Sequence, residues 1–272
     1  WSVVAGSHAA LNDVVDLLDQ PFPQYYFQNE SQPLEIKDSF SVNKLSFRYN
    51  ESSPWVLDDI SFKIMKGSRI GLIGSTGSGK STTLDLLMGL LEPTHGELMV
   101  DNMKIDDRSI RAWRQTVAHV PQSIFLADTS IAENIAFGVA PENINMPQVK
   151  DAAKKAMIDN FIESRPNGYS EVVGERGVRL SGGQRQRIGI ARALYKKANV
   201  IVFDEATSAL DNETEKVVME AIRNLGEELT LIIVAHRLST LENCTHIIEL
   251  DQGKILRIGS YDEIINHARS TS

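Results

Sequence analysis

Residues 74–81, GSTGSGKS, hold three glycines, four small hydroxyl side chains and one lysine, a mixture that suits chemistry better than core packing. The loop follows an apolar stretch that predicts a buried strand, and it precedes a stretch with helical character. A glycine-rich turn between a strand and a helix lets successive backbone N–H groups point at one anion, and the positive end of the helix faces the same place. The spacing fits G-x-x-x-x-G-K-S/T at every fixed position, which predicts a loop that binds the phosphates of a nucleotide together with Mg²⁺.

The side chains of this loop have separate expected roles. We expect Lys80 to reach the β- and γ-phosphates and the hydroxyl of Ser81 to coordinate Mg²⁺. The alternative, a chance glycine-rich turn, is disfavoured because the strand, the helix and the Lys-Ser pair occur together. The expected nucleotide contacts are Gly74, Ser75, Thr76, Gly77, Ser78, Gly79, Lys80, Ser81 and Thr82.

A second group of chemical residues follows the apolar run at 200–203, which ends in Asp204-Glu205. A parallel strand delivers its last residues to the crevice where ligands bind. We therefore expect Asp204 to hold Mg²⁺ through water, and Glu205 to polarise a water for attack on the γ-phosphate. A solvated strand end would explain the pair by itself, but the phosphate loop on the same chain favours the functional interpretation.

The elements around these residues predict an α/β fold. Alternating stretches at 40–49 and 55–64 predict antiparallel strands, and 96–105 and 246–259 predict hairpins. Buried strands at 200–203 and 229–235 alternate with helices, which indicates a sheet with a parallel core. Three helices are expected around them, one opened by Pro147 that runs through residue 164, one at 182–195, and one whose apolar face is Val218, Ala221, Ile222 and Leu225.

Composition narrows the class of protein. The 272 residues carry a net charge of −8, which disfavours nucleic acid as a partner, and one cysteine, Cys244, excludes an internal disulfide framework. No apolar run approaches the ~18 residues that would span a bilayer, and no signal peptide is visible. Because the chain starts at Trp1, we expect it to be a soluble fragment of a longer protein.

The segment LSGGQRQR at 180–187 adds a resemblance to a known family. From about residue 39 to its end, the chain resembles the ATP-binding-cassette (ABC) ATPases. Each further motif has a plain structural alternative, such as strand packing for Tyr49, a loop position for Gln122 or a helix cap for Asp211. The ordered combination supports the resemblance, and it comprises Tyr49, Gln122, GERG at 174–177, SALD at 208–211 and His236 in AHRLST.

The resemblance implies a P-loop NTPase (RecA-like) core with an antiparallel β subdomain and a helical insertion at about 128–195. It implies ATP and Mg²⁺ as ligands, bound in a head-to-tail dimer in which each copy completes the partner's site. The implied catalytic residues are Glu205, His236, Lys80 and Gln122, and Tyr49 would stack on adenine. The implied contacts to the partner's ATP are Ser181, Gly182, Gly183, Gln184 and Asp211, and the implied metal site consists of Ser81, Gln122 and, through water, Asp204.

The motifs look closest to the exporter branch of the family. Residues 1–33 would then be a helix and linker at the tail of an absent membrane domain, followed by the ATPase domain at 34–272. Expected partners are a second ATPase domain, identical or different, and a transmembrane domain, at the cytoplasmic face of a plasma or inner membrane. The expected cargo is a lipid-linked oligosaccharide or another lipid or polysaccharide. The alternatives are a soluble ABC ATPase of repair, chromosome structure or translation, and a catalytically dead cassette.

Overall fold

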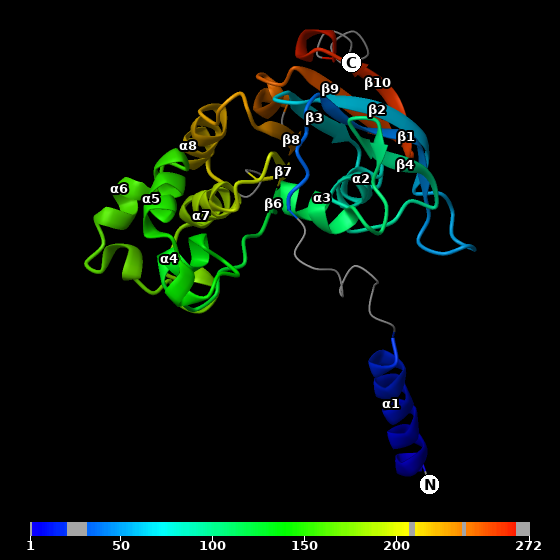
Figure 1. Ribbon diagram of the computed structural model, residues 1–272, viewed down its shortest axis with the longest axis horizontal. Helices are drawn as coiled ribbons and strands as arrows, with labels where there is room; N and C mark the ends of the chain where they lie inside the picture. The colour runs from blue at the N-terminus through cyan, green and yellow to red at the C-terminus, as the bar shows by residue number, and fades with distance from the viewer. Residues whose placement is uncertain (1, 21–31, 207–209, 236–237, 265–272) are drawn as a thin grey trace.

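The structure is a computed structural model, and it describes residues 2–20, 32–206, 210–235 and 238–264 (Figure 1). Two sheets and a group of helices make up the fold, as the sequence predicts. The larger sheet has the strand order β10-β9-β3-β8-β7-β6. Its neighbouring strands run parallel except for the β9–β10 hairpin. The strands are β3 (Arg69–Gly74), β6 (Val117–Val120), β7 (Val200–Asp204), β8 (Thr230–Val234), β9 (His246–Asp251) and β10 (Lys254–Gly259).

The smaller sheet is antiparallel, with the order β2-β1-β4-β5. The predicted antiparallel strands and the hairpin at 96–105 are thereby confirmed. Its strands are β1 (Ser39–Phe47), β2 (Leu57–Met65), β4 (His95–Val100) and β5 (Met103–Lys104).

The period of two along the buried strands divides the interior into two cores. On β7, Ile201 and Phe203 face the helical side, whereas Val200 and Val202 face the smaller sheet. Such strands are covered on both faces, which explains why they are continuous apolar runs in the sequence. A ligand would bind at the carboxyl ends of the parallel strands, along the border between the two cores.

The core between the sheets also contains α2 (Lys80–Leu87) and α3 (Ile110–Thr116). Trp113 is fully buried there, and its Nε1 donates a hydrogen bond of 2.7 Å to the Leu87 carbonyl oxygen. Its ring lies 5.3 Å from that of Phe40, centroid to centroid. This contact ties the helix that follows the phosphate loop to the smaller sheet.

The opposite face of the larger sheet packs against the helical side of the molecule (Figure 1). The predicted helical insertion is present, with short 3₁₀ turns Pro141–Asn143, Gly168–Ser170 and Glu175–Gly177 between its helices. The helices on this side are α4 (Ile131–Ile135), α5 (Met146–Lys155), α6 (Asp159–Glu163), α7 (Gly182–Tyr195) and α8 (Asn212–Arg223).

The single helix predicted from Pro147 to residue 164 is wrong, because the chain breaks between α5 and α6. Met157 adopts a φ of 56°, and the N–H of Ile158 turns back to the Ala153 carbonyl oxygen at 3.0 Å. The break places Ile158 in the core with no exposed surface. The freed carbonyl of Met157 accepts a hydrogen bond from Nη1 of Arg187 on α7. Tertiary packing therefore overrides the local helical pattern.

Near the N-terminus, α1 (Ser2–Leu18) confirms the predicted helix. The apolar side chains expected on one face, Leu11, Val14, Val15 and Leu18, are all exposed. Among the helices in the described part of the chain, none is long and apolar enough to cross a bilayer.

Candidate nucleotide site

The predicted site residues at 74–82, 122 and 204–205 lie where the parallel strands of the larger sheet end. Asp204, the last residue of β7, pairs with Val234 at the end of β8, and Leu72 of β3 pairs with the same valine. The phosphate loop follows β3, and Gln122 follows β6 two residues after Val120. His236, which follows β8, lies outside the described residues, so its expected role stays a prediction.

The three glycines of the phosphate loop have different structural surroundings. Gly74 has a φ of 150°, and a Cβ there would lie 2.3 Å from the Leu250 carbonyl oxygen. Gly79 has a φ of 102°, and its Cβ would lie 2.6 Å from Leu57 Cδ2. Gly77 has a φ of 83° and nothing within 4 Å of the Cβ position. Two glycines therefore allow close packing, and the third leaves open space on the loop.

Lys80 stabilises the loop by hydrogen bonds to its backbone. Its side chain is buried, and Nζ donates hydrogen bonds to the carbonyl oxygens of Gly74 at 2.8 Å and Ser75 at 2.9 Å. Ser78 is only 1% exposed, and its Oγ has no hydrogen-bond partner among the described residues. The loop is thus preformed and keeps one buried hydroxyl without an internal partner among the described residues.

The start of α2 is open to an anion. Gly79 is its N-cap and supplies no side-chain acceptor for the first N–H groups of the helix. These groups, together with the helix dipole, attract negative charge. Ser81 is exposed at this position. The geometry therefore fits the predicted binding of phosphate.

Tyr49 lies just past β1 and reaches the same helix. Its Oη is 3.4 Å from Thr82 Oγ1, and its ring meets Phe47 edge-on at 5.0 Å between centroids. The tyrosine is nevertheless 64% exposed, so a face of the ring is free for stacking on a planar ligand. Thr82 is buried, and its contact with Tyr49 places the expected adenine site next to the phosphate loop.

The two carboxylates at the end of β7 differ in environment. Burial raises the pKa of Asp204, His119 and Lys80 oppose that rise, and the charges of Glu205 and Asp85 add to it. Glu205 has a φ of 49°, unusual for a residue with a side chain, and its N–H donates to the Val234 carbonyl oxygen at 3.1 Å. Such backbone strain is often found at functional sites.

The residues expected to hold Mg²⁺ carry oxygen ligands of the kind that this ion binds. Within the described ranges, no three His, Cys, Asp or Glu side chains converge into a group that could hold a metal ion. Mg²⁺ is commonly held by one or two protein oxygens together with substrate phosphates. Ser81, Asp204 and Gln122 carry hydroxyl, carboxylate and amide oxygens and come after or at the ends of β3, β7 and β6, so the donor types fit Mg²⁺ brought by a nucleotide.

The LSGGQ segment forms the start of α7. Ser181 and Gln184 make a reciprocal capping box, in which the Gln184 N–H donates to Ser181 Oγ and the Ser181 N–H donates to Gln184 Oε1. A Cβ on Gly183 would lie 2.0 Å from Thr214 Cγ2 on α8, and one on Gly182 would lie 3.1 Å from Leu210 Cδ2. Glycine at these positions therefore lets α7 and the start of α8 approach each other.

Asp211 caps α8, as its position before the helix suggests. Its Oδ2 accepts a hydrogen bond of 3.1 Å from the Thr214 N–H, and this contact with Thr214 lowers the pKa of Asp211. Both Asp211 and Ser181 are exposed. Two residues of the expected SALD motif, Ser208 and Ala209, lie outside the described residues.

The structure does not bring the LSGGQ segment to the chain's own phosphate loop. In Figure 1, α7 lies on the helical side of the molecule and α2 lies across the sheet from it. The predicted site residues thus form two separate sets. One set surrounds the phosphate loop, and the other is exposed at the start of α7 and α8.

Two polar residues near Asp204 were missed by sequence reasoning. Asp85 and His119 both act electrostatically on Asp204. Desolvation lowers the pKa of His119, whereas Asp204 and Asp85 act to raise it. Of the two, only Asp85 could have been predicted from the sequence. It follows Ser81 by four residues and therefore lies on the same helix face.

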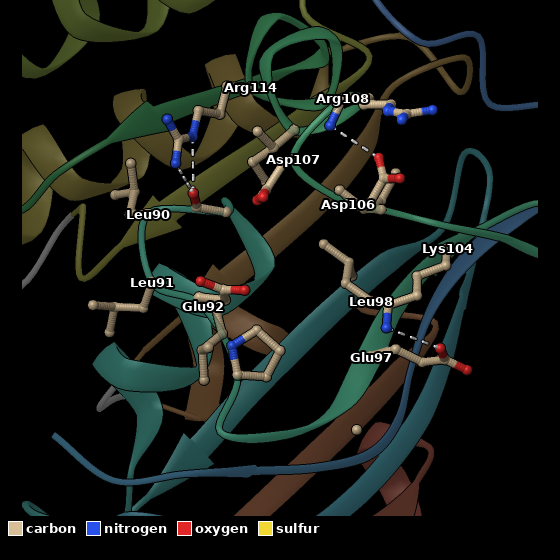
Figure 2. A pocket seen from close by; sticks show the side chains of 16 residues that line it. Leu90, Leu91, Glu92, Glu97, Leu98, Lys104, Asp106, Asp107, Arg108 and Arg114 are labelled. Atoms are coloured by element: carbon tan, nitrogen blue, oxygen red, sulfur yellow. Dashed lines mark hydrogen bonds and ion pairs between the residues drawn. The ribbon is translucent and has the colours of Figure 1, made fainter. Parts of the chain in front are cut away.

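A groove of about 820 Å³ lies elsewhere, between the end of α2, β4–β5 and α3 (Figure 2). No predicted site residue lines it. Lys104 Nζ is 3.8 Å from Glu97 Oε2, and Arg114 donates two hydrogen bonds to the Gly89 carbonyl oxygen. Because these charges are engaged with the chain itself, the groove does not replace the nucleotide site.

The comparisons with known proteins agree with this geometry. The ABC transporter family profile matches residues 57–208. An "ATP-dependent lipid A-core flippase" from Alkalilimnicola ehrlichii is 41% identical over 95% of this chain and 44% of the relative. "ABC transporter B family member 13" of Arabidopsis thaliana is 43% identical over 85% of this chain and 18% of the relative.

A solved structure gives the same result for the fold. A bacterial Atm1-family ABC exporter with ATP bound superposes with a TM-score of 0.82 and 32% identity, over 99% of this chain and 48% of the exporter chain. This chain spans less than half the length of each of these three proteins. The chain belongs to the ABC transporter family, and it is an ATPase domain of the kind found in exporters.

Proposed function

We propose that this chain binds ATP with Mg²⁺ and hydrolyses it as one half of a dimeric engine that drives export across a membrane. The observation that supports this most is the joint placement of an open phosphate loop and two carboxylates. Lys80 begins the helix that follows β3, Asp204 ends β7, only β8 separates these two strands, and the Lys80 charge acts to lower the pKa of Asp204. An ATPase needs this combination of a phosphate cradle, a cation site and a base.

Each residue of the loop side has a proposed role. The N–H groups of residues 75–81 and the Lys80 ammonium hold the β- and γ-phosphates, which requires Lys80 to exchange its present carbonyl partners for phosphate oxygens. Tyr49 stacks on adenine through its exposed ring face. Glu205 polarises the attacking water, while His236 contacts the γ-phosphate and Gln122 senses it.

Ser81, Gln122 and, through water, Asp204 would hold Mg²⁺. Bound there, the ion would offset the negative charge of the β- and γ-phosphates. The chain's own contribution is to place an exposed hydroxyl and a half-buried carboxylate beside the loop. Burial raises the pKa of Asp204, so the carboxylate gains more from a cation than an exposed one would.

The exposed second set of residues suggests a head-to-tail dimer. Ser181, Gly182, Gly183, Gln184 and Asp211 would contact the ATP held by the partner's loop. The Ser181 Oγ and the first N–H groups of α7 form a second phosphate cradle. Two ATP molecules would then lie at a two-fold interface, and their hydrolysis would release it.

Two exposed aromatic rings beside the Gln122 loop suit docking of a membrane domain. Phe125 is 60% exposed and Phe137 is 53% exposed. Arg192 contacts the backbone of one and the ring of the other, since Nη1 donates to the Phe125 carbonyl oxygen at 3.2 Å and the guanidinium lies 4.4 Å from the Phe137 ring centroid. Exposed aromatic side chains are common anchors for a partner helix.

The division of the chain follows from the same proposal. Residues 1–33 would be the tail of the membrane domain, and the exposed apolar side chains of α1 would be covered by it. Residues 34–272 would be the ATPase domain, with the helical subdomain at about 128–195. The whole would work at the cytoplasmic face of a plasma or inner membrane.

The cargo is proposed from the sequence resemblance and from the names of the relatives. The names of several relatives describe lipid A-core flippases. A lipid-linked oligosaccharide, or another lipid or polysaccharide, is therefore the cargo class we favour. Nothing in an ATPase domain touches the cargo, so this part needs a transport assay on the longer protein.

The test of the proposal is ATP turnover per molecule as a function of protein concentration. We expect specific activity to rise with concentration, because two copies complete each other's sites. Glu205→Gln should abolish turnover, since the amide cannot accept the proton of the attacking water. Glu220→Gln, an exposed glutamate on α8, is the matched control and should retain turnover.

Each opposite result would contradict one part of the proposed function. Turnover independent of concentration would contradict the dimeric site. Turnover that survives Glu205→Gln would contradict the assignment of the base, and only nucleotide binding by the loop at 74–81 would remain.

A further inference from the structure

The turn between β9 and β10 contacts the phosphate loop, which follows β3, the strand beside β9 (Figure 1). Gln252 and Gly253 form this turn with φ values of 46° and 79°, the pair of positive values that a type I′ hairpin requires. The ladder pairs Asp251 with Lys254, which leaves the backbone groups of Gly253 outside it. Gly253 is buried, and its N–H donates a hydrogen bond of 3.1 Å to the Ser78 carbonyl oxygen. The turn therefore binds the phosphate loop through its backbone.

The start of β2 fixes the same glycine from another side. The Gly253 carbonyl oxygen accepts a hydrogen bond of 2.9 Å from the Asp58 N–H. A Cβ on Gly253 would lie 2.5 Å from the Val56 carbonyl oxygen and 3.3 Å from Leu57 Cα, and such backbone atoms cannot rotate away. The same Val56 oxygen lies 3.1 Å from the Cβ position of Gly79. The turn, β2 and the phosphate loop thus meet at one point, and position 253 needs glycine for space as well as for its φ.

The hydrogen bond from the turn sets the direction of the peptide group that joins Ser78 to Gly79. No peptide bond in the described ranges is cis, so the carbonyl and the N–H of this group point in opposite directions. Because the Ser78 carbonyl oxygen faces the turn, the Gly79 N–H points away from the turn. Gly79 is the N-cap of α2, so this N–H lies next to the unpaired N–H groups at the start of the helix.

We propose that Gly253 is a positioning residue for nucleotide binding, because its N–H orients the Ser78–Gly79 peptide so that the Gly79 N–H donates to a phosphate oxygen. Without the hydrogen bond from the turn, this peptide would be free to rotate, since Gly79 has no side chain to restrict its φ. A rotated peptide would present the Ser78 carbonyl oxygen to the phosphate instead of an N–H. This inference rests on the proposed binding of ATP by the loop at 74–81.

The experiment measures the affinity of the whole chain for two ligands, a non-hydrolysable ATP analogue with Mg²⁺ and inorganic tripolyphosphate alone. Gly253→Ala places a Cβ against the Val56 carbonyl and moves the turn off the loop. It should weaken both ligands about tenfold, the size of effect expected when one hydrogen bond to a charged group is lost. Gly138→Ala is the matched control, because Gly138 has a φ of 87° but nothing within 4 Å of its Cβ position. The control should leave both affinities unchanged.

A second variant removes only the N–H of Gly253. Cys244 is the one cysteine of the chain and precedes the turn, so a synthetic peptide of residues 244–272 can be ligated to residues 1–243. An ester in place of the Gly253 amide adds no atom near Val56, and it should weaken both ligands about tenfold relative to the same ligated chain with the amide. The midpoint of thermal unfolding without ligand shows that each variant folds. A purely structural role would lower this midpoint without changing the affinities of the folded chain.

The outcomes separate this inference from the proposed function. If Lys80→Ala leaves tripolyphosphate binding intact, the loop is not the phosphate site, and the inference fails together with the proposed function. If Lys80→Ala abolishes binding but the ester chain or Gly253→Ala binds both ligands as tightly as its control, only the inference is overturned. A loss of affinity for the ATP analogue with unchanged binding of tripolyphosphate would show that the turn acts on the Tyr49 side of the site, which would also overturn it.

Discussion

Gly183 packs directly against Thr214, such that a methyl group on the glycine would lie 2.0 Å from Thr214 Cγ2. This contact joins the start of α7 to the start of α8, where Asp211 is the N-cap. The two exposed segments proposed to meet the partner's ATP are therefore fixed relative to each other by a glycine. Its φ does not require glycine, so the requirement is space.

Gly183→Ala should destabilise the chain by about 1–3 kcal/mol through overpacking. Thr214→Ser removes the clashing Cγ2 and should restore stability in the double variant, since alanine is otherwise the better helix residue. Urea unfolding of the four proteins tests this. A double variant as unstable as Gly183→Ala alone would show that the contact is not the cause.

The glycines of the phosphate loop should respond differently to alanine. Gly74→Ala should cost about 3 kcal/mol or more, because the Cβ would meet backbone atoms at a left-handed φ. Gly77→Ala should cost about 1–2 kcal/mol for its φ alone, yet it should weaken ATP binding because its Cβ occupies open space on the loop. Unfolding midpoints and calorimetric ATP titrations separate the two effects. Equal costs at both positions would contradict the geometry.

The carboxylate of Asp101 anchors the segment by which the chain enters β1. It accepts hydrogen bonds from the N–H groups of Lys37 at 2.6 Å, Asp38 at 2.8 Å and Ser39 at 2.9 Å. Partial burial acts to raise the pKa of Asp101, but these hydrogen bonds and the Lys37 charge outweigh it and lower the pKa. A lowered pKa in the folded state means that the anchor stabilises the fold above the unfolded-state pKa.

Asp101→Asn should therefore lower the free energy of unfolding at pH 7 by about 1–2 kcal/mol. The difference from the native chain should shrink as the pH falls below about 4 and the native carboxylate becomes protonated. Urea unfolding at several pH values measures it, with the exposed Asp107→Asn as control. A difference that is constant across this range would contradict the role of the charge.

Phe137 should matter to the longer protein more than to this chain. Phe137→Ala should change the free energy of unfolding of the chain by less than about 1 kcal/mol and leave its ATP turnover intact. In the membrane-embedded longer protein, loss of a docking anchor should reduce ATP-driven transport about tenfold or more. Leu256→Ala, at a similarly exposed apolar residue on the edge strand β10, is the control. Normal transport by Phe137→Ala would remove this surface from the proposed docking site.

Local patterns in the sequence predicted the strands and most helices because they are signals of period 2 or 3.6. The break at Met157 could not be predicted in this way, since it depends on burial of Ile158 and on Arg187 from a distant helix. The short β6 and α3 were also missed, because four and seven residues are too few to show a period.

The same distinction holds for the site residues. Those in contiguous motifs could be predicted, and those brought together only by the fold could not. The phosphate loop and Asp204-Glu205 are contiguous motifs, so their positions at the end of strands followed from the sequence. The proximity of His119 to Asp204 depends on the β6–β7 register, which no contiguous motif contains. The contact of Gly183 with Thr214 likewise needs two helices that meet only in the fold.

The central claim is that two copies of the chain complete each other's ATP site, and mixing two inactive variants tests it most directly. Lys80→Ala removes the phosphate ligand of the loop, and Ser181→Tyr blocks the second cradle at the start of α7. In a mixed dimer, one site combines both defects and the other is intact. An equal mixture should regain turnover up to about a quarter of the native activity, although each variant alone is inactive. A mixture that stays as inactive as its components would contradict the shared site.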